Sequence, residues 1–421
     1  MTHPNEIHSN VLIVGGGVIG LACAWYLARS GQSVRIVEKE AMGAGASHGN
    51  CGLIFVSDLP PLCVPGAASQ ELKRMLRGES PLYIKPRPDI PLASWLLRFA
   101  AHCTTKHRTR SIRARDAILR TSLELFDELF DEEKLACDFE RRGILMAFTD
   151  PAALDKYHQT NRLLEPFGLA ANYHDHRSVR ELEPALNDRV CGGWHHEADS
   201  HLRPESLMAA WTQAAREKGI LIQEGCLVED FETRRGAIHG VATSTGRYTA
   251  DQFVLAAGAW TPVIGRQLKL RIPVQPGKGY SITMDRPAAC PEIPCYLYER
   301  NMVVTPWQSG YRLGGTMEFS GFDTELDQRR LDNLEKSAAL YLRTPLGERV
   351  TERWTGLRPM CVDDMPIIGR SPGWDNLYLA TGHGMLGLST ATGTGRLIAD
   401  MMLGRQVPFD PKPFSLERFQ K

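Results

Sequence analysis

Three glycines and one acidic residue near the start of the chain have the types and spacing of a dinucleotide-binding turn. Gly15, Gly17 and Gly20 form the pattern GxGxxG, and Glu38 follows at about the 20-residue distance at which an acid meets a ribose hydroxyl. Glycine here permits a tight turn, lets the backbone approach a pyrophosphate and lets a helix pack close to a strand. The N-terminus of the following helix would offer N–H donors to the phosphates. The motif predicts a dinucleotide site without distinguishing FAD from NAD.

The segments around these glycines have the patterns of a strand, a helix and a second strand. Val11 to Val14 predicts a short buried strand, Leu21 to Ser30 a helix, and Ser33 to Val37 a strand that ends at the acid. Residues 11–28 carry no charge and are just long enough to span a membrane. Their glycines would weaken a spanning helix, whereas they suit a strand that turns into a helix. We therefore predict a complete βαβ unit.

A second glycine-rich junction follows near the end of the chain. Residues 376–380 predict a strand, 381–387 (TGHGMLG) a turn, and 389–403 a helix. The N-terminus of that helix could stabilise negative charge on the pyrimidine edge of a reduced flavin, a role that nicotinamide does not require. The alternative is a plain packing junction. This junction favours FAD as the dinucleotide.

The overall composition is that of an ordinary globular protein. The chain has 421 residues, of which 43% are hydrophobic, so two structural units are expected. Its 49 basic and 49 acidic side chains cancel, which argues against nucleic acid and favours a small-molecule partner. The ten cysteines form no CxxC pair and no cluster at metal-ligand spacing, so we expect a reduced compartment and no metal. The first residues lack a secretory signal, which predicts a cytoplasmic protein.

The patterns between the two junctions predict an interleaved α/β protein. Residues 76–190 have helical periodicity, whereas 219–230 and 253–259 are apolar strands that suit a nucleotide-binding sheet. Short strands and turns from 273 to 321 predict a separate antiparallel sheet. We expect a Rossmann-like FAD-binding domain interleaved with an α+β substrate domain made of that sheet and cap helices. The expected boundaries are 1–75, 191–265 and 346–421 for the FAD-binding domain, and 76–190 and 266–345 for the substrate domain.

Six stretches, spread over the whole chain, resemble the D-amino acid dehydrogenases within the larger group of glycine oxidases, D-amino acid oxidases and sarcosine oxidases. Both the order and the spacing of the stretches fit that group. They are VLIVGGGVIGLACAWYLARSGQSVRIVEKE (11–40), GAGASHGNCGLI (43–54), LAAGAW (255–260), PGKGYSITM (276–284), GLRPMCVDDMPIIGR (356–370) and NLYLATGHGMLGLSTATGTGRLIADMM (376–402).

The resemblance implies noncovalently bound FAD, with the flavin between the nucleotide domain and the substrate sheet. Residues 47–50 match the loop that passes near the isoalloxazine, 384–387 match the loop at its pyrimidine edge, and Val228 matches a residue whose backbone meets the adenine. The full set of expected cofactor-binding residues is Gly15, Gly17, Val18, Ile19, Gly20, Glu38, Lys39, Ser47, His48, Gly49, Asn50, Val228, Gly258, Gly384, Met385, Leu386 and Gly387.

Three residues are candidates for the chemistry itself. Arg358, in GLRP, lies where the group places the arginine that binds the substrate carboxylate; a guanidinium pairs bidentately with a carboxylate and would orient the Cα–H toward the flavin. Without the resemblance, an ion pair would be its commoner role. Tyr280 could hydrogen-bond the carboxylate or the amine, or simply pack in a strand. His48 could be an acid, a base or a covalent flavin anchor, although its register differs from histidine-linked relatives; the alternative is a hydrogen-bonded histidine.

The resemblance implies an FAD-dependent dehydrogenase that oxidises a small D-amino or cyclic imino acid to its imine or 2-oxo acid by hydride transfer to flavin N5. Glycine oxidases carry an arginine in the turn after the last strand, where this chain has HGMLG (383–387). The more apolar site predicts a bulkier or cyclic substrate of the D-proline or hydroxy-D-proline type. The alternatives are a glycine- or sarcosine-type oxidase that uses oxygen, a flavin-bearing RNA-modification module and an NAD-linked enzyme.

Dehydrogenase relatives pass their electrons to a quinone or another respiratory carrier, and one segment bears on this step. Residues 90–99 (IPLASWLLRF) are apolar, and basic residues follow them at positions 106, 108, 110, 113 and 115. An interfacial helix in peripheral contact with the inner face of the membrane would have this pattern. A cap helix with a solvated basic continuation is the alternative.

Overall fold

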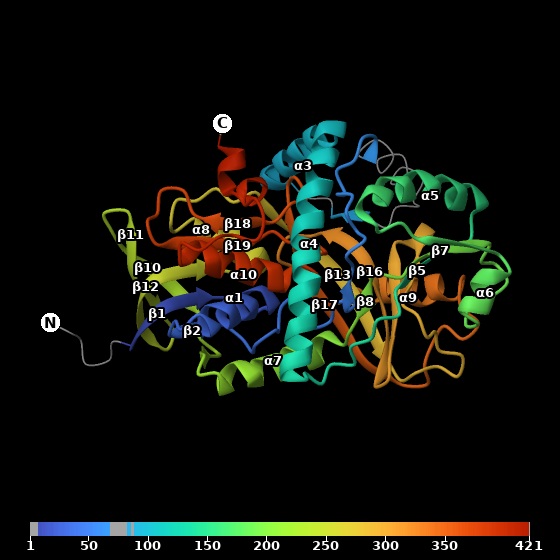
Figure 1. Cartoon of the computed structure of the whole chain (residues 1–421), viewed down its shortest axis with the longest axis horizontal. Coiled ribbons are helices and arrows are strands. Elements are labelled where there is room, and N and C mark those ends of the chain that lie inside the picture. The colour runs from blue at the N-terminus through green and yellow to red at the C-terminus, as the bar shows by residue number, and fades with distance from the viewer. Residues whose placement is uncertain (1–6, 68–81, 86–87, 421) are drawn as a thin grey trace.

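The computed structural model describes residues 7–67, 82–85 and 88–420, which form two large sheets with helices packed on them (Figure 1). The first sheet has eight strands in the order β10-β11-β12-β1-β2-β9, with β19 beside β12 and β18 beside β19. Its strands are β1 (Ile7–Val14), β2 (Val34–Val37), β9 (Leu221–Gln223), β10 (Val228–Arg234), β11 (Ala237–Thr243), β12 (Gly246–Leu255), β18 (Ile367–Arg370) and β19 (Leu377–Thr381).

The predicted βαβ unit forms the centre of this sheet. β1 and β2 are parallel neighbours, with Val11 opposite Val34, and helix α1 (Val18–Arg29) connects them. β1 also pairs in parallel with β12, so it is an interior strand, which explains why residues 11–14 are continuously apolar. The helix begins three residues earlier than predicted, because Gly17 is extended and serves as its N-cap.

Helix α10 (Ala391–Met402) packs between α1 and the long helix α4 (Thr105–Glu133), and two glycines make this possible. A Cβ at Gly395 would lie 2.5 Å from the carbonyl oxygen of Ala22 in α1. A Cβ at Gly393 would lie 2.9 Å from the carbonyl oxygen of Ile118 in α4. The glycines therefore allow three helices to approach closely on one face of the first sheet, where α7 (Pro204–Glu217) also contacts α1.

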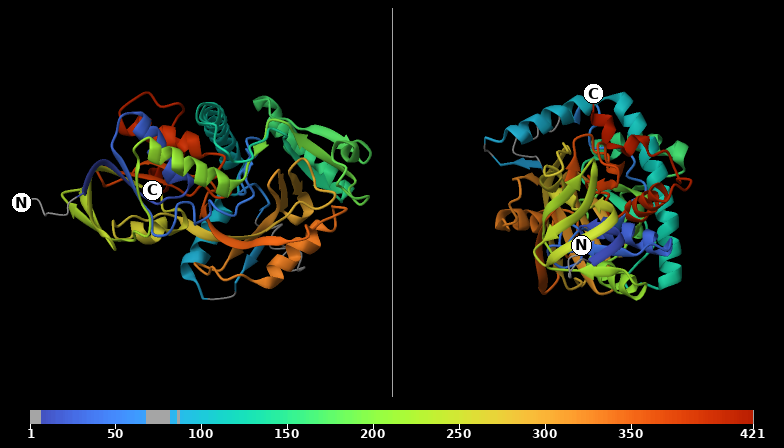
Figure 2. Two further views of the ribbon diagram at one scale, coloured as in Figure 1. Left: turned by 90° about the horizontal axis from the view of Figure 1, so that it is seen from below. Right: turned by 90° about the vertical axis from the view of Figure 1, so that its left-hand side faces the viewer.

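The second sheet has nine strands in the order β17-β13-β16-β15-β14-β5-β7-β6, with β4 beside β16. Most neighbours are antiparallel, as the sequence predicts, although β14 with β5 and β16 with β4 are parallel. Figure 2 shows this sheet beside the first one, with the smaller helices on its outer side. The strands are β4 (Leu82–Ile84), β5 (Ile144–Phe148), β6 (Asn172–Asp175), β7 (Gly192–His196), β13 (Val274–Met284), β14 (Cys295–Leu297), β15 (Met302–Trp307), β16 (Gly310–Phe319) and β17 (Val350–Cys361), and the helices are α5 (Pro151–Leu164), α6 (Ser178–Leu182) and α9 (Gln328–Ala338).

The structure divides the chain differently from the expected domain boundaries at three places. β7 and β17 fall in segments assigned to the FAD-binding domain (191–265 and 346–421), yet both belong to the second sheet, where β7 pairs with β5 and β17 with β13. α4 falls in the expected cap segment, yet its buried face shares a core with α1 and α10. An apolar strand or helix does not specify its partner, which is why local patterns misplaced these elements. The expected boundary between residues 75 and 76 lies outside the described residues.

Helix α3 (Ile90–His102) lies beside the end of the chain and close to the second sheet. Asp89 caps it by accepting a hydrogen bond from the backbone N–H of Leu92, and Trp95 anchors it against Phe319 at a ring-centroid distance of 5.2 Å. Ile90, on the same helix, is 83% exposed. Within the described ranges, no helix has both the length and the apolar character needed to cross a membrane.

Candidate active site

One large cavity of about 1280 Å³ lies between the two sheets. Its walls combine residues that follow β1 and β2, the loop 44–53, strands of the second sheet and the turn after β19. The volume exceeds the roughly 300–1,000 Å³ of an ordinary small-ligand site, which leaves room for a dinucleotide together with a second molecule. Val228 and Gly258, both expected to contact the cofactor, line this cavity.

The glycine turn after β1 has the close packing that the motif predicts. Gly15 has a φ of +115°, and a Cβ there would lie 2.4 Å from the carbonyl oxygen of Ala256. A Cβ at Gly20 would lie 2.0 Å from the carbonyl oxygen of Gly15, so α1 can approach the turn only with glycine at this position. Gly15, Gly17, Val18 and Ile19 line the cavity, whereas Gly20 acts through packing.

Glu38 and Lys39 lie at the end of β2, where they line the cavity. One carboxylate oxygen of Glu38 accepts a hydrogen bond from the backbone N–H of Gly16 at 2.6 Å, and the other accepts one from the backbone N–H of Glu40 at 3.0 Å. These bonds fix the carboxylate beside the glycine turn, where the motif predicts the ribose contact. The ammonium group of Lys39 lies 4.0 Å from the ring centroid of Trp260.

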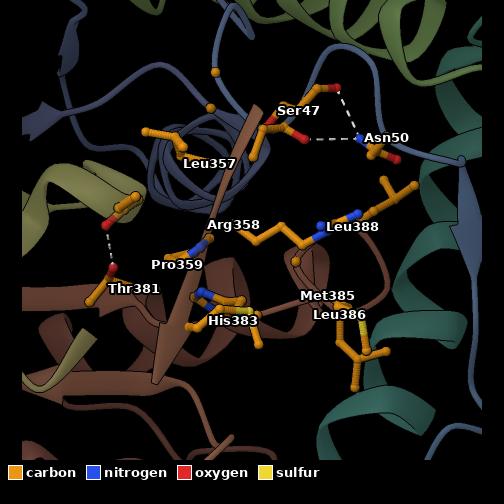
Figure 3. A pocket seen from close by; sticks show the side chains of 18 of the residues that line it. Ser47, Asn50, Leu357, Arg358, Pro359, Thr381, His383, Met385, Leu386 and Leu388 are labelled. Carbon is orange, nitrogen blue, oxygen red and sulfur yellow. Dashed lines mark hydrogen bonds between the residues drawn. The ribbon is translucent and has the colours of Figure 1, made fainter. Parts of the chain in front are cut away.

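The loop at residues 47–50 is tied to the start of α1. The hydroxyl oxygen of Ser47 accepts a hydrogen bond from the backbone N–H of Val18 at 2.9 Å, and the Asn50 side chain donates to the carbonyl oxygen of Ser47 at 3.2 Å (Figure 3). Ser47 and Asn50 line the cavity. Gly49 does not, and a Cβ there would lie 2.2 Å from the ring of Trp354. This loop therefore passes between the nucleotide turn and β17.

His48 and Tyr280, both predicted to be catalytic, are not among the residues that line the cavity. His48 Nε2 lies 2.7 Å from a carboxylate oxygen of Glu352, whose hydrogen bond raises the pKa of the imidazole. Tyr280 is 1% exposed and donates a hydrogen bond to Glu318 at 3.1 Å. The structure brings both side chains into contacts within the protein instead of into the cavity, so we include neither in the proposed chemistry.

Arg358 extends from β17 toward the middle of the cavity, between the 47–50 loop and the 383–388 turn (Figure 3). It donates to the carbonyl oxygen of Thr316 at 2.9 Å, and within the described residues no acidic side chain forms an ion pair with it. Burial lowers the pKa of its guanidinium. A Cβ at Gly279 would lie 2.2 Å from this guanidinium, so glycine on the neighbouring strand leaves the space that it occupies. Arg358 is thus a cation that faces the cavity without a counter-ion.

The turn after β19 also faces the cavity. Gly384, Met385, Leu386 and Gly387 line it, and the backbone N–H of Gly384 donates to the carbonyl oxygen of Pro359 at 3.0 Å, which joins the turn to the strand of Arg358. His383 Nε2 lies 3.1 Å from the hydroxyl oxygen of Thr394. Burial lowers the pKa of His383 to about 3, so this imidazole is neutral at physiological pH.

The structure adds cavity residues that sequence reasoning missed. They come from the loop after β3 (Leu53–Ile54), from α5, and from β14 with the short helix that follows it, and these segments are distant in the sequence. No local pattern marks them, because isolated aromatic and acidic residues are common in any globular chain. They are Phe55, Asp58, Tyr157, Tyr296 and Tyr298.

FAD fits this cavity better than a smaller group does. The glycine turn would cradle the pyrophosphate, Glu38 would meet the ribose, and the 384–387 turn would lie beside the flavin ring. Ser47 and Asn50 line the wall between these two regions. The protein is thus a dinucleotide-dependent oxidoreductase by class. Three features define this class: a Rossmann-type sheet, a dinucleotide cradle and a cation that faces the same cavity.

Comparison with known proteins gives the family. Residues 10–401 match the FAD dependent oxidoreductase family DAO, and the chain belongs to this family. It is 34% identical to a D-amino acid dehydrogenase of Methylobacterium nodulans, over 98% of this chain and 99% of that protein. Its fold is similar to glycine oxidase from Geobacillus kaustophilus (TM-score 0.77, 23% identity, 98% of this chain and 99% of that one). It is also similar to L-proline dehydrogenase from P. horikoshii (TM-score 0.75, 18% identity, 99% and 98%). The predictions of an FAD-binding α/β fold and of an FAD-dependent amino acid-oxidising enzyme are thereby confirmed.

Proposed function

We propose that the protein dehydrogenates a D-amino or cyclic imino acid whose carboxylate binds Arg358. The observation that carries this proposal is a guanidinium that faces the cavity and has no acidic partner among the described residues. A charge held away from bulk water is costly unless an opposite charge joins it, so the site favours an anionic ligand. The D-amino acid dehydrogenase of Methylobacterium nodulans, with which the chain aligns over nearly its whole length, supports a D-amino acid as the source of that carboxylate.

The protein's contribution to the reaction is orientation and charge. FAD, when bound, supplies the acceptor for the two electrons that leave the carbon–nitrogen bond. Arg358 presents a planar fork that fixes the carboxylate and hence the direction of the Cα–H. The lining residues that the structure describes include a single histidine, His383, and its lowered pKa keeps it from acting as a cationic acid. We therefore infer that the substrate amine reacts in its neutral form, without a strong protein base.

The product identifies the reaction directly. We expect the FAD-loaded protein, supplied with a dye acceptor, to convert D-amino acids to 2-oxo acids and ammonia, and to leave the L-enantiomers unchanged. Cyclic imino acids such as D-proline should give the cyclic imine instead. Formation of 2-oxo acid from L-amino acids alone would contradict the proposed stereochemistry.

For the electron acceptor, we propose a membrane quinone reached through α3. Leu97 on α3 is 74% exposed and Met385 is 48% exposed, and both also line the cavity, so an apolar rim surrounds part of it. Lys106, Arg110 and Arg113 are exposed on α4, and none forms an ion pair within the described residues. An apolar rim beside free cations suits an anionic membrane surface.

Two measurements distinguish this acceptor from oxygen. Reduced protein should be reoxidised faster by a water-soluble quinone than by air, and it should bind vesicles that contain anionic lipid. Ile90→Glu, at an exposed position of α3 that does not line the cavity, should weaken vesicle binding without changing reduction of the flavin by the amino acid. Rapid reoxidation in air without vesicle binding would favour the oxidase alternative.

A further inference from the structure

We propose that Asp58 forms a subsite for a cationic side chain, so that the preferred substrate is a basic D-amino acid such as D-lysine or D-arginine. This inference rests on the proposed function, because it takes the Arg358 cavity as the substrate site. The geometry that carries it is a second charged group in the same cavity, of opposite sign to Arg358 and also without a partner.

Asp58 lies in the loop that follows β3, and it lines the cavity. Its side chain remains partly accessible and, within the described residues, accepts no hydrogen bond and forms no ion pair. Burial nevertheless raises its pKa to about 6, which indicates that the accessible space around it is enclosed by protein and is not bulk solvent. The carboxylate is ionised at neutral pH and is available to a ligand.

The nearest cation is Arg115, whose charge lowers the pKa of Asp58 against the effect of burial, but within the described residues it forms its ion pair with another carboxylate. Arg115 lies 2.6 Å from a carboxylate oxygen of Asp364 and also donates to the carbonyl oxygen of Pro60 at 3.0 Å. It approaches only the backbone carbonyl of Asp58, at 3.5 Å. This arrangement holds the Asp58 loop in place through main-chain contacts and leaves the Asp58 carboxylate unpaired.

Aromatic rings form the walls beside Asp58. Tyr157 and Tyr298 lie edge to face with a centroid distance of 5.6 Å, Tyr296 lies 6.4 Å from Tyr298, and Phe55 lines the same cavity. Burial is the main cause that raises the pKa of Tyr157 and of Tyr296, and the negative charge of Asp58 adds to it in both. Aromatic faces attract cations and also pack against a methylene chain. A flexible chain that ends in an ammonium or guanidinium matches these walls and this carboxylate.

The separation of Asp58 from Arg358 favours the side chain of the substrate over its α-amino group. Tyr296 is near both groups, since Asp58 raises its pKa and Arg358 lowers it. Within the described residues the two groups form no ion pair: the Arg358 guanidinium lies against β13 and β16 of the second sheet, whereas the Asp58 loop is held by Arg115 of α4. An α-ammonium is bonded to the same carbon as the carboxylate, so a partner for it would lie beside Arg358. A carboxylate on another wall of the cavity, such as Asp58, would instead meet a group at the end of the substrate's side chain.

The test compares substrates of similar shape that differ in charge. We expect the FAD-loaded protein to reduce its flavin with a higher kcat/KM for D-lysine and D-arginine than for D-norleucine, which has no side-chain charge. Asp58→Asn should lower kcat/KM for the two basic substrates roughly tenfold to hundredfold, the range for a lost hydrogen bond to a charged group, and leave D-norleucine within about twofold. Asp58→Glu should restore part of the loss.

Asp155→Asn provides the matched control, because Asp155 is exposed on α5 and does not line the cavity. FAD content and thermal stability of Asp58→Asn show whether the variant is folded. An equal loss for D-lysine and D-norleucine would assign Asp58 to the α-amino group and overturn the inference, as would unchanged kinetics with D-lysine. Activity with D-norleucine or D-proline but not with basic substrates would remove the Asp58 subsite and leave the proposed function intact, whereas failure with every D-amino acid would remove both.

Discussion

Replacing Arg358 by methionine should sharply lower kcat/KM without destabilising the protein, a combination that an arginine of purely structural importance would not give. Within the part of the chain that the structure describes, Arg358 makes one hydrogen bond, to the carbonyl oxygen of Thr316, and has no acidic partner. In the proposed complex it donates two charge-assisted hydrogen bonds to the substrate carboxylate, each contributing ~1.5–3 kcal/mol. Their loss corresponds to a fall in kcat/KM of roughly 10²–10⁴-fold.

Arg312 provides the comparison, since it is a fully buried arginine on β16, which is separated from β17 by β13 alone. Its guanidinium lies 3.0 Å from Glu205 and donates to the carbonyl oxygen of Asn50 at 2.7 Å and to the Thr283 hydroxyl at 2.9 Å. Breaking such a buried pair costs about 3 kcal/mol or more, so Arg312→Met should lower the free energy of unfolding clearly. Arg358→Met should leave that free energy unchanged or raise it by about 1 kcal/mol, because it removes a charge without a partner.

The assays are chemical denaturation of both variants and steady-state kinetics of Arg358→Met with a dye acceptor. The fall in kcat/KM should come mainly from a higher KM, because the carboxylate is bound in the ground state as well as in the transition state. A large loss of stability in Arg358→Met, together with unchanged kinetics, would refute the carboxylate role and assign Arg358 to the structural framework.

Three further changes test other parts of the site. Gly15→Ala should abolish FAD binding and cost ~1–3 kcal/mol of stability, since its Cβ would lie 2.4 Å from a carbonyl oxygen at a φ of +115°; the flavin content of the purified protein measures this. Tyr280→Phe should keep kcat/KM within about twofold and lose ~0.5–1.5 kcal/mol of stability, because among the described residues its hydroxyl bonds Glu318 alone; a large kinetic effect would return Tyr280 to the catalytic set. His48→Gln should cost at most about 1 kcal/mol, because the pair with Glu352 is partly exposed. Glu352 raises the pKa of His48 above 6.5, so the cost should be largest near pH 6 and disappear as the pH rises through the raised pKa; a cost that grows with pH would contradict this.

The parts of the fold that follow from local sequence were predictable. The strand, glycine turn and helix between residues 11 and 30 depend on neighbouring residues only, and the structure shows them nearly where the pattern places them. The membership of β7 and β17 in the second sheet depends on pairing with distant strands, which a local pattern does not encode.

The placement of Tyr280 shows the same limit within one strand. Successive residues of a strand point to opposite faces, so GKGY contains both cavity-facing and core-facing positions. Gly279 faces Arg358, and Tyr280 therefore points into the hydrophobic core on the other side. The sequence identifies a strand here, but only the register with β17 decides which residue meets the cavity.

The part of the cavity around Asp58 could not be predicted from the sequence, for another reason. Its walls come from three separated segments, so no spacing in the sequence connects them. The apolar site predicted from HGMLG described one wall only, and Met385 in that turn lies at the exposed rim. The tyrosines and the carboxylate become a site only when the second sheet brings them together.

Anaerobic reduction of the bound flavin tests the proposed reaction most directly. The purified, FAD-loaded protein is mixed without oxygen with single D-amino acids, their L-enantiomers and cyclic imino acids, and its visible spectrum is followed. We predict that the flavin absorbance bleaches with at least one D-amino or imino acid and persists with its enantiomer, and that Arg358→Met bleaches only at much higher substrate concentration. A flavin that stays oxidised with every one of these compounds would contradict the assignment of the cavity to amino acid dehydrogenation.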